Sequence, residues 1–147
     1  MQRLSDLARH LGIELVGADA AWAGASIDTR SLSAGQLFAA LPGARVDGHD
    51  FVRKAASLGA AGALVSRRLD NELPQLVVPD VLAAMQSLAA AWRRHWQGLV
   101  VAVTGSNGKT GVKNMLAAIL RQRGPAFATP GNLNNHLGVP LSLLNLG

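Results

Sequence analysis

Short apolar runs, separated by glycine, proline and polar residues, dominate the first 80 positions of this chain. Runs of this length predict strands, which we place at residues 13–16, 26–30, 37–41, 63–66 and 76–78. Apolar residues at helical spacing predict one helix at residues 5–11, with Ser5 as its N-cap, and another at about 50–58. Because a helix alternates with strands here, the first 80 residues predict a small α/β domain.

A longer helical pattern follows Pro79 and Asp80, which together form a start signal for a helix. Apolar and aromatic residues then keep the helical spacing at Val81, Leu82, Met85, Leu88, Ala89, Trp92 and Trp96. After them, an unbroken apolar run at residues 99–103 predicts a strand. A last helix is predicted from the spacing of Val112, Leu116, Ile119 and Leu120. We place a domain boundary near residue 80, with one domain at 1–80 and the start of a second at 81–147.

The residues between that strand and that helix, 104–110, have the sequence TGSNGKT. Glycines in such a loop let backbone N–H groups turn inward onto phosphate oxygens, and the helix N-terminus adds a partial positive charge. Lys109 has the position to reach the outer phosphates, and Thr110 has the hydroxyl needed to ligate Mg²⁺. Val103 stands where the general pattern has a leading glycine. An ordinary glycine-rich turn would explain neither the lysine nor the threonine. The sequence therefore predicts a site for ATP and Mg²⁺ formed by Gly105, Ser106, Asn107, Gly108, Lys109 and Thr110.

Charge is distributed unevenly between the two halves of the chain, whose net charge is +5. Residues 1–80 contain eight Lys and Arg against nine Asp and Glu, whereas residues 81–147 contain six Lys and Arg and no acidic residue. A triphosphate site normally includes a carboxylate that holds Mg²⁺ directly or through water. Since no carboxylate follows Thr110, we expect the acidic partners and the remaining strands of the second domain to lie beyond residue 147.

Composition favours a cytoplasmic protein without membrane insertion. The chain has no cysteine, it does not open with a basic-then-apolar signal stretch, and none of its apolar runs approaches the roughly 20 residues of a membrane helix. A nucleic-acid-binding module is a rival interpretation, because the second half is basic. Its arginines lie on predicted helix faces, however, and aromatic residues make up only 4% of the chain, so solvated helix faces explain the basicity better.

Several further motifs closely resemble the Mur ligase family. Together with the phosphate loop they are IDTRS at residues 27–31, GQLFAAL at 35–41, DGHDF at 47–51, TPGNLNN at 129–135 and GVPL at 138–141. The resemblance covers essentially the whole chain but only about the first third of the family's usual length. It implies a small Mur-type uridine-nucleotide domain at 1–80, followed by the start of a P-loop, Rossmann-like ATPase domain.

The order GNLNN then GVPL resembles one member of the family in particular, the ligase that adds D-alanyl-D-alanine to UDP-N-acetylmuramoyl-tripeptide in peptidoglycan synthesis. The resemblance implies transfer of the ATP γ-phosphate to the tripeptide carboxylate, with Lys109 and Thr110 as catalytic residues. Attack by D-alanyl-D-alanine on the resulting acyl phosphate would follow. It further implies a protein that is monomeric at full length, although this chain alone is expected to be inactive.

Substrate residues are implied by the same resemblance. Thr29, Arg30 and Ser31 would lie at the uridine diphosphate end, where Arg30 could also simply pair with Asp28. His49 would contact the uracil or the pyrophosphate, although Asp47 and Gly48 are also an ordinary turn signal. Asn134 and Asn135 would orient the substrate carboxylate, with an asparagine-rich loop as the alternative. At Gly111, Asn114 and His136 the chain departs from the family pattern.

Two alternatives remain from the sequence. The family member that acts on UDP-muramoyl-dipeptide has a similar first half, and its substrate distinguishes it. A non-catalytic uridine-nucleotide-binding module would bind UDP-sugars tightly without any further chain.

Overall fold

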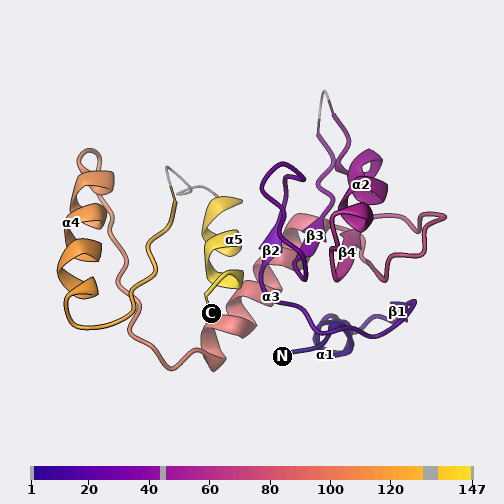
Figure 1. The fold of residues 1–147 in the computed structure, drawn as a ribbon, viewed down its shortest axis with the longest axis horizontal. Helices are drawn as coiled ribbons and strands as arrows, with labels where there is room; N and C mark the ends of the chain where they lie inside the picture. Colours follow the sequence, from indigo (N-terminus) through magenta and orange to yellow (C-terminus); the bar gives the residue numbers. More distant parts are fainter. Residues whose placement is uncertain (1, 44–45, 131–135, 147) are drawn as a thin grey trace.

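The computed structural model describes residues 2–43, 46–130 and 136–146 of the 147-residue chain. Its first half contains one five-stranded sheet with the strand order β1-β5-β4-β3-β2 (Figure 1). Strands β2 to β5 are parallel to one another, and β1 is antiparallel to β5. The strands are β1 (Leu15–Val16), β2 (Ala25–Ser26), β3 (Leu37–Ala39), β4 (Gly62–Val65) and β5 (Gln75–Val77). The predicted α/β domain is confirmed; β1, β2 and β3 are shorter than predicted, and β4 and β5 each begin one residue earlier.

Helices cover both faces of this sheet because successive strand residues point to opposite sides. In β3, Leu37 and Ala39 join a core cluster with residues of α1 (Leu4–Leu11) and α3 (Val81–His95). Phe38 between them joins a second cluster, on the side of α2 (Val52–Ser57), which follows the 3₁₀ helix η1 (Gly48–Phe51). These apolar contacts on both faces fix the direction of each strand, and therefore where each strand ends.

Side-chain hydrogen bonds explain two of the predicted element boundaries that the structure corrects. Arg3, not Ser5, is the N-cap of α1, while the backbone N–H and hydroxyl of Ser5 donate to Asp19. The strand predicted at 26–30 ends at Ser26, because Asp28 accepts the backbone N–H of Arg30 and turns the chain. Short polar side chains that bind nearby backbone groups compete with regular structure in this way.

The long helix after Asp80 is confirmed as α3, and Asp80 accepts the backbone N–H of Ala83 as its N-cap. The helix after the phosphate loop is confirmed as α4 (Lys109–Arg121), which stands apart from the sheet in Figure 1. A short helix, α5 (Gly138–Leu144), lies beside α3. None of the described helices is long and apolar enough to cross a membrane.

The strand predicted at 99–103 is wrong, since these residues have no regular structure. A strand requires a neighbour for its backbone hydrogen bonds. Within the described ranges no strand lies beside this segment, and Leu99 and Val101 are 83% and 52% exposed. Apolar composition alone therefore does not produce a strand here.

Candidate functional site

The predicted phosphate loop at 104–110 turns at two glycines with positive φ angles. Gly105 and Gly108 have φ angles of +150° and +78°, and Gly108 is the N-cap of α4. A Cβ on Gly108 would meet no atom within 4 Å, so glycine is favoured there by the backbone conformation and not by lack of space. The loop residues around them are exposed, which leaves the N-terminus of the 13-residue helix α4 open to a ligand.

Lys109 folds back over this loop. Its Nζ donates to the carbonyl oxygen of Gly105 and, at 3.4 Å, to that of Ser106. The ammonium group thus lies above the loop, next to the positive end of the α4 dipole, and the first turn of α4 carries no acidic residue. A positive charge beside a helix N-terminus is suited to binding a phosphate group. The arrangement fits the nucleotide that the sequence predicts.

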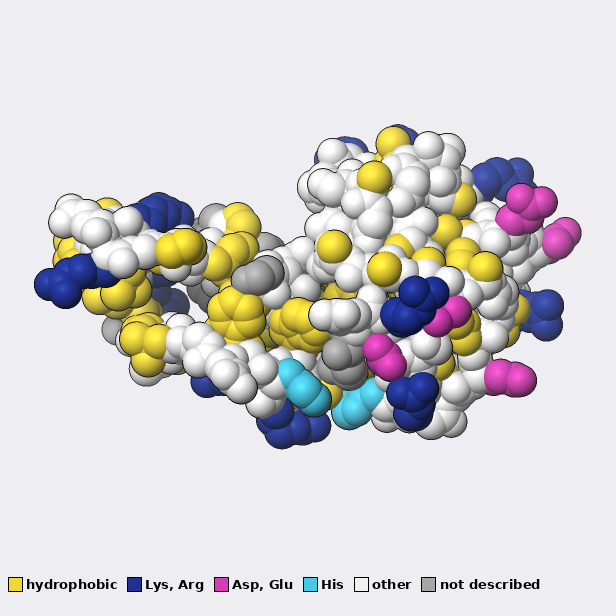
Figure 2. Space-filling view, turned by 60° about the horizontal axis from the view of Figure 1, so that its bottom comes forward, with side chains coloured by type: hydrophobic (Ala, Val, Ile, Leu, Met, Phe, Trp, Pro, Cys, Tyr) yellow, Lys and Arg dark blue, Asp and Glu magenta, His cyan; other side chains and the backbone are white. Residues whose placement is uncertain are grey.

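Thr110 lies in the first turn of α4, directly after Lys109. Among the described residues, no three or more His, Cys, Asp or Glu side chains lie close enough to hold a metal ion. The charge asymmetry of the sequence is also visible in space, since Figure 2 shows acidic side chains only over the part that contains the sheet. Among the described residues of this loop, the Thr110 hydroxyl remains the predicted Mg²⁺ ligand.

One turn beyond Lys109, Lys113 lies on the same side of α4. Its Nζ donates to the carbonyl oxygen of Thr129, which fixes the chain that leads toward the GNLNN segment. The sequence analysis did not single out Lys113, although its spacing of four residues from Lys109 was the available signal. Between α4, α5 and residues 125–129 lies a cavity of about 440 Å³ with a mostly apolar lining.

The predicted uridine-diphosphate residues lie at the carboxyl edge of the sheet, in the loop after β2. In open α/β sheets, ligands bind outside this edge. The Arg30 guanidinium makes a paired contact with Asp28, at 2.6 to 3.0 Å, and its side chain is 86% exposed. Those hydrogen bonds lower the pKa of Asp28 to about 2. Thr29 is buried, and the Ser31 hydroxyl donates to the Asp28 carbonyl oxygen. Arg30 is therefore an exposed cation with a fixed orientation.

His49 is buried at the same edge and connects the loop after β3 to the end of β4. Its Nε2 accepts the backbone N–H of Ser66 at 2.9 Å, so the proton must be on Nδ1, which lies 2.6 Å from Asp47. Asp47 also accepts from Arg67 at 2.9 Å, and these contacts, led by the His49 backbone N–H, hold the pKa of Asp47 well below its usual range. Both ring nitrogens are engaged within the protein. A contact between His49 and the substrate stays a prediction, and the ring would have to break one of these bonds to make it.

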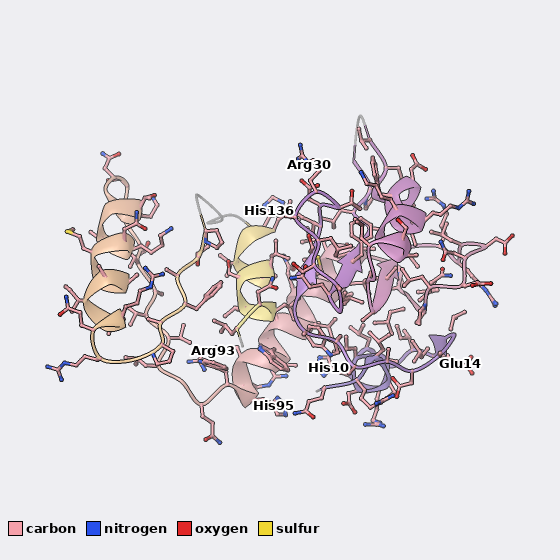
Figure 3. The ribbon with its side chains drawn as sticks, in the orientation of Figure 1. His10, Glu14, Arg30, Arg93, His95 and His136 are labelled. Carbon is pink, nitrogen blue, oxygen red and sulfur yellow. The ribbon has the colours of Figure 1, made fainter. Side chains whose placement is uncertain are left out.

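Asn134 and Asn135 lie outside the described residues. The next residue, His136, is described, and its carbonyl oxygen lies 3.5 Å from the side-chain nitrogen of Gln86 on α3. Figure 3 shows Arg30 beyond the carboxyl end of β2 and His136 at the start of α5, at the same end of the molecule. Arg30 and His136 therefore lie toward a common end of the molecule.

Comparison with known proteins gives a consistent result. A family model described as Mur ligase family, catalytic domain, matches residues 22–93, and one described as Mur ligase middle domain matches residues 103–147. The UDP-N-acetylmuramoyl-tripeptide--D-alanyl-D-alanine ligase of Escherichia coli is 52% identical over 97% of this chain and 32% of its own length. The chain thus spans about a third of that relative.

Solved structures also resemble this chain. MurF from Acinetobacter baumannii is 38% identical, with a TM-score of 0.80 over 97% of this chain and 32% of its own. MurF from Thermotoga maritima, solved in complex with ADP, is 33% identical, with a TM-score of 0.68 over 85% of this chain and 29% of its own. The likeness therefore extends through both the sheet and the phosphate loop.

Proposed function

This chain belongs to the Mur ligase family, and from that premise we propose that it is the amino-terminal part of an ATP-dependent ligase. The reaction we propose joins D-alanyl-D-alanine to UDP-N-acetylmuramoyl-tripeptide. The observation that carries the proposal is the 52% identity, over nearly the whole chain, to a ligase named for this reaction. The phosphate-loop geometry supports it independently, because Lys109 and the positive end of α4 meet at one exposed loop.

In the proposed enzyme, the loop N–H groups and Lys109 hold the phosphates of ATP, and the Thr110 hydroxyl contributes to the Mg²⁺ site. ATP would supply a phosphoryl group to one oxygen of the substrate carboxylate, with ADP as the leaving group, so that phosphate, a good leaving group, departs when the amine attacks the acyl carbon. Lys109 would offset the negative charge that gathers on the transferring group. For this step no side-chain nucleophile is required.

For the muramoyl substrate, we propose contacts with Thr29, Arg30 and Ser31 at the uridine diphosphate end and with Asn134 and Asn135 near the peptide. The exposed Arg30 guanidinium can donate hydrogen bonds to phosphate oxygens from the N–H groups that Asp28 does not occupy. We retain the division into a substrate domain at 1–80 and the start of an ATP-binding domain at 81–147. A cytoplasmic location fits a reaction that consumes ATP.

A chimera tests the reaction directly. Residues 1–147 would replace the matching third of the E. coli ligase, and phosphate release would be measured with D-alanyl-D-alanine and either UDP-muramoyl-tripeptide or UDP-muramoyl-dipeptide. We expect turnover with the tripeptide only. Turnover with the dipeptide only, or none from a folded chimera, would contradict the proposal.

Calorimetry with Mg·ATP on the same chimera tests the loop, using Lys109→Ala against Lys113→Ala. We expect Lys109→Ala to abolish measurable nucleotide binding, because it removes the cation over the loop. Lys113→Ala removes an equal charge one turn further along α4 and should leave most of the affinity. Equal losses for the two variants would assign the effect to net charge alone.

A further inference from the structure

The loop between β2 and β3, at residues 27–36, carries the three residues proposed for the uridine-diphosphate end of the substrate. Asn145, directly after α5, joins the two ends of this loop. Its Oδ1 accepts the backbone N–H of Ala25, just before the loop begins, at 3.2 Å. The same oxygen accepts the side-chain N–H of Gln36, where the loop ends, at 3.1 Å. A residue 109 positions beyond Gln36 therefore closes the base of the loop with a single atom.

The other half of the Asn145 carboxamide fixes the orientation of its side chain. Nδ2 donates to the carbonyl oxygens of Ala25 and Leu141, both at 2.8 Å. The carboxamide thus binds both the N–H and the C=O of Ala25 on the free side of β2, as a further strand would. A Cβ on Gly24 would overlap Asn145 Oδ1, so the close approach needs glycine at position 24. All four hydrogen-bonding sites of the carboxamide are therefore used.

At the start of the loop, hydrogen bonds of Ser26 extend this constraint into the turn that follows β2. Ser26 comes directly after Ala25 and is buried, and its hydroxyl accepts the backbone N–H of Asp28 at 3.2 Å. The same hydroxyl lies 3.4 Å from that of Ser31. Asp28 in turn orients Arg30 through its paired contact with the guanidinium. The position of this exposed cation thus depends on where β2 ends.

At the end of the loop, Gln36 extends the constraint back toward the same turn. Its Oε1 accepts the backbone N–H of Ser33 at 2.9 Å, while its Nε2 donates to Asn145. Apolar packing already holds α5 against the sheet, since Leu144 is 1% exposed and belongs to the core cluster that α1, α3 and the sheet form. The two carboxamides add direction to that contact, because hydrogen bonds depend on angle as well as on distance.

We propose that Asn145 and Gln36 are positioning residues, which close the base of the 27–36 loop and so hold Arg30 in place for a phosphate of the uridine nucleotide. The two carboxamides act through the turn that carries Arg30, and neither has to touch the ligand. The proposal rests on the proposed function for the identity of that ligand, but the closure of the loop does not.

Hydrogen exchange tests the closure of the loop without any ligand. Asn145→Leu keeps the size of the side chain and loses its hydrogen bonds. We expect the backbone N–H groups of Ser31 and Ser33 to exchange about tenfold faster in this variant, although they donate to Asp28 and Gln36 and not to Asn145. Gln36→Leu should accelerate exchange of the Ser31 N–H in the same way, and it tests the closure if Asn145→Leu does not fold.

The control is the backbone N–H of Leu73, which donates to the Asn71 carboxamide in the loop between β4 and β5. Its exchange should be the same in both variants as in the unchanged chain. Equal acceleration of all three N–H groups would indicate general destabilisation of the domain. No acceleration at Ser31 or Ser33 would show that the loop holds its shape without the two carboxamides. Either result overturns the closure.

Calorimetry with UDP tests the positioning role. We expect Asn145→Leu to weaken UDP binding about tenfold, and Asn71→Leu, which removes a carboxamide from the other loop, to leave it unchanged. If Asn145 acts through Arg30, Asn145→Leu should cost little further affinity in an Arg30→Ala background, because the two losses are then one loss. Fully additive losses would overturn the positioning role. So would a variant that unfolds more easily but, when folded, binds UDP as the unchanged chain does.

The two measurements separate this proposal from the proposed function. If the unchanged chain does not bind UDP, the proposed function fails at its uridine end and the positioning role fails with it. Hydrogen exchange then still decides whether Asn145 and Gln36 close the loop.

Discussion

Replacing His49 with leucine separates its structural role from a role in substrate binding. In the structure the imidazole joins two loops at the carboxyl edge of the sheet, with Nδ1 bound to Asp47 and Nε2 bound to the backbone N–H of Ser66. Leucine fills a similar volume in the same buried position but makes neither bond. The substitution therefore tests the hydrogen bonds without opening a large cavity.

The expected cost follows from these two bonds. A hydrogen bond to a charged group contributes roughly 1.5 to 3 kcal/mol, and leaving a buried partner unsatisfied costs roughly 1 to 3 kcal/mol. Ser66 is only half-buried, so its N–H recovers part of its loss from water. We therefore expect His49→Leu to lower the free energy of unfolding by about 3 kcal/mol. His10→Leu removes an exposed histidine that contacts Ser87, and should change the free energy by less than about 0.5 kcal/mol.

Urea unfolding followed by tryptophan fluorescence measures the free energy of unfolding of both variants. Calorimetry with UDP, without urea, measures the binding affinity of the folded proteins. If the role of His49 is structural, His49→Leu should lower the free energy of unfolding and leave the UDP affinity of the folded protein unchanged. The reasoning would be refuted by the opposite result, in which stability is unchanged and UDP affinity falls. That outcome would assign the ring to the ligand, as the family resemblance implies.

Two further predictions concern acid and the core. Hydrogen bonds from Arg3 lower the pKa of Asp19 from 3.8 to about 2, and those from Arg30 do the same for Asp28. The unfolded chain therefore binds these two protons more readily than the folded chain. The stability that the two carboxylates contribute is complete above about pH 4 and is lost as the pH falls toward 2. Urea midpoints that stay constant between pH 5 and pH 2.5 would contradict this. Met85→Ala, at a fully buried position of α3, should cost about 3 kcal/mol of unfolding free energy, whereas Met115→Ala, at a position 61% exposed on α4, should cost under about 0.5 kcal/mol. Equal costs in thermal unfolding would show that α4 is buried in solution.

The sequence predicts most of the first module because its signals are local. The continuous apolar runs of β3 and β4, the Asp80 cap and the left-handed glycine before α4 each depend on a few neighbouring residues. For the same reason the order of the phosphate-loop residues predicts their chemistry, and in the structure the Lys109 ammonium contacts the carbonyl oxygens of Gly105 and Ser106. Predictions of this kind need no knowledge of distant contacts.

The sequence does not predict features that depend on a partner far along the chain. The run at 99–103 is apolar enough for a strand, but pairing requires a neighbour that composition does not reveal. His49 has the residue type of a ligand contact, and only the positions of Asp47 and Ser66 show that both ring nitrogens are engaged. Arg67 likewise gains its role from a carboxylate 20 residues away.

The division of the chain into two units in sequence also differs from its division in space. Residues 138–146 belong to the second family model, yet Leu144, Asn145 and Leu146 contact α3 and β2, whereas α4 of the same model stands apart from the sheet. Helices α3 and α5 thus pack with the sheet of residues 1–80, although both follow the proposed boundary near residue 80. The turn at 28–31 and α5 therefore belong to one packed body, from which α4 and the phosphate loop before it stand apart.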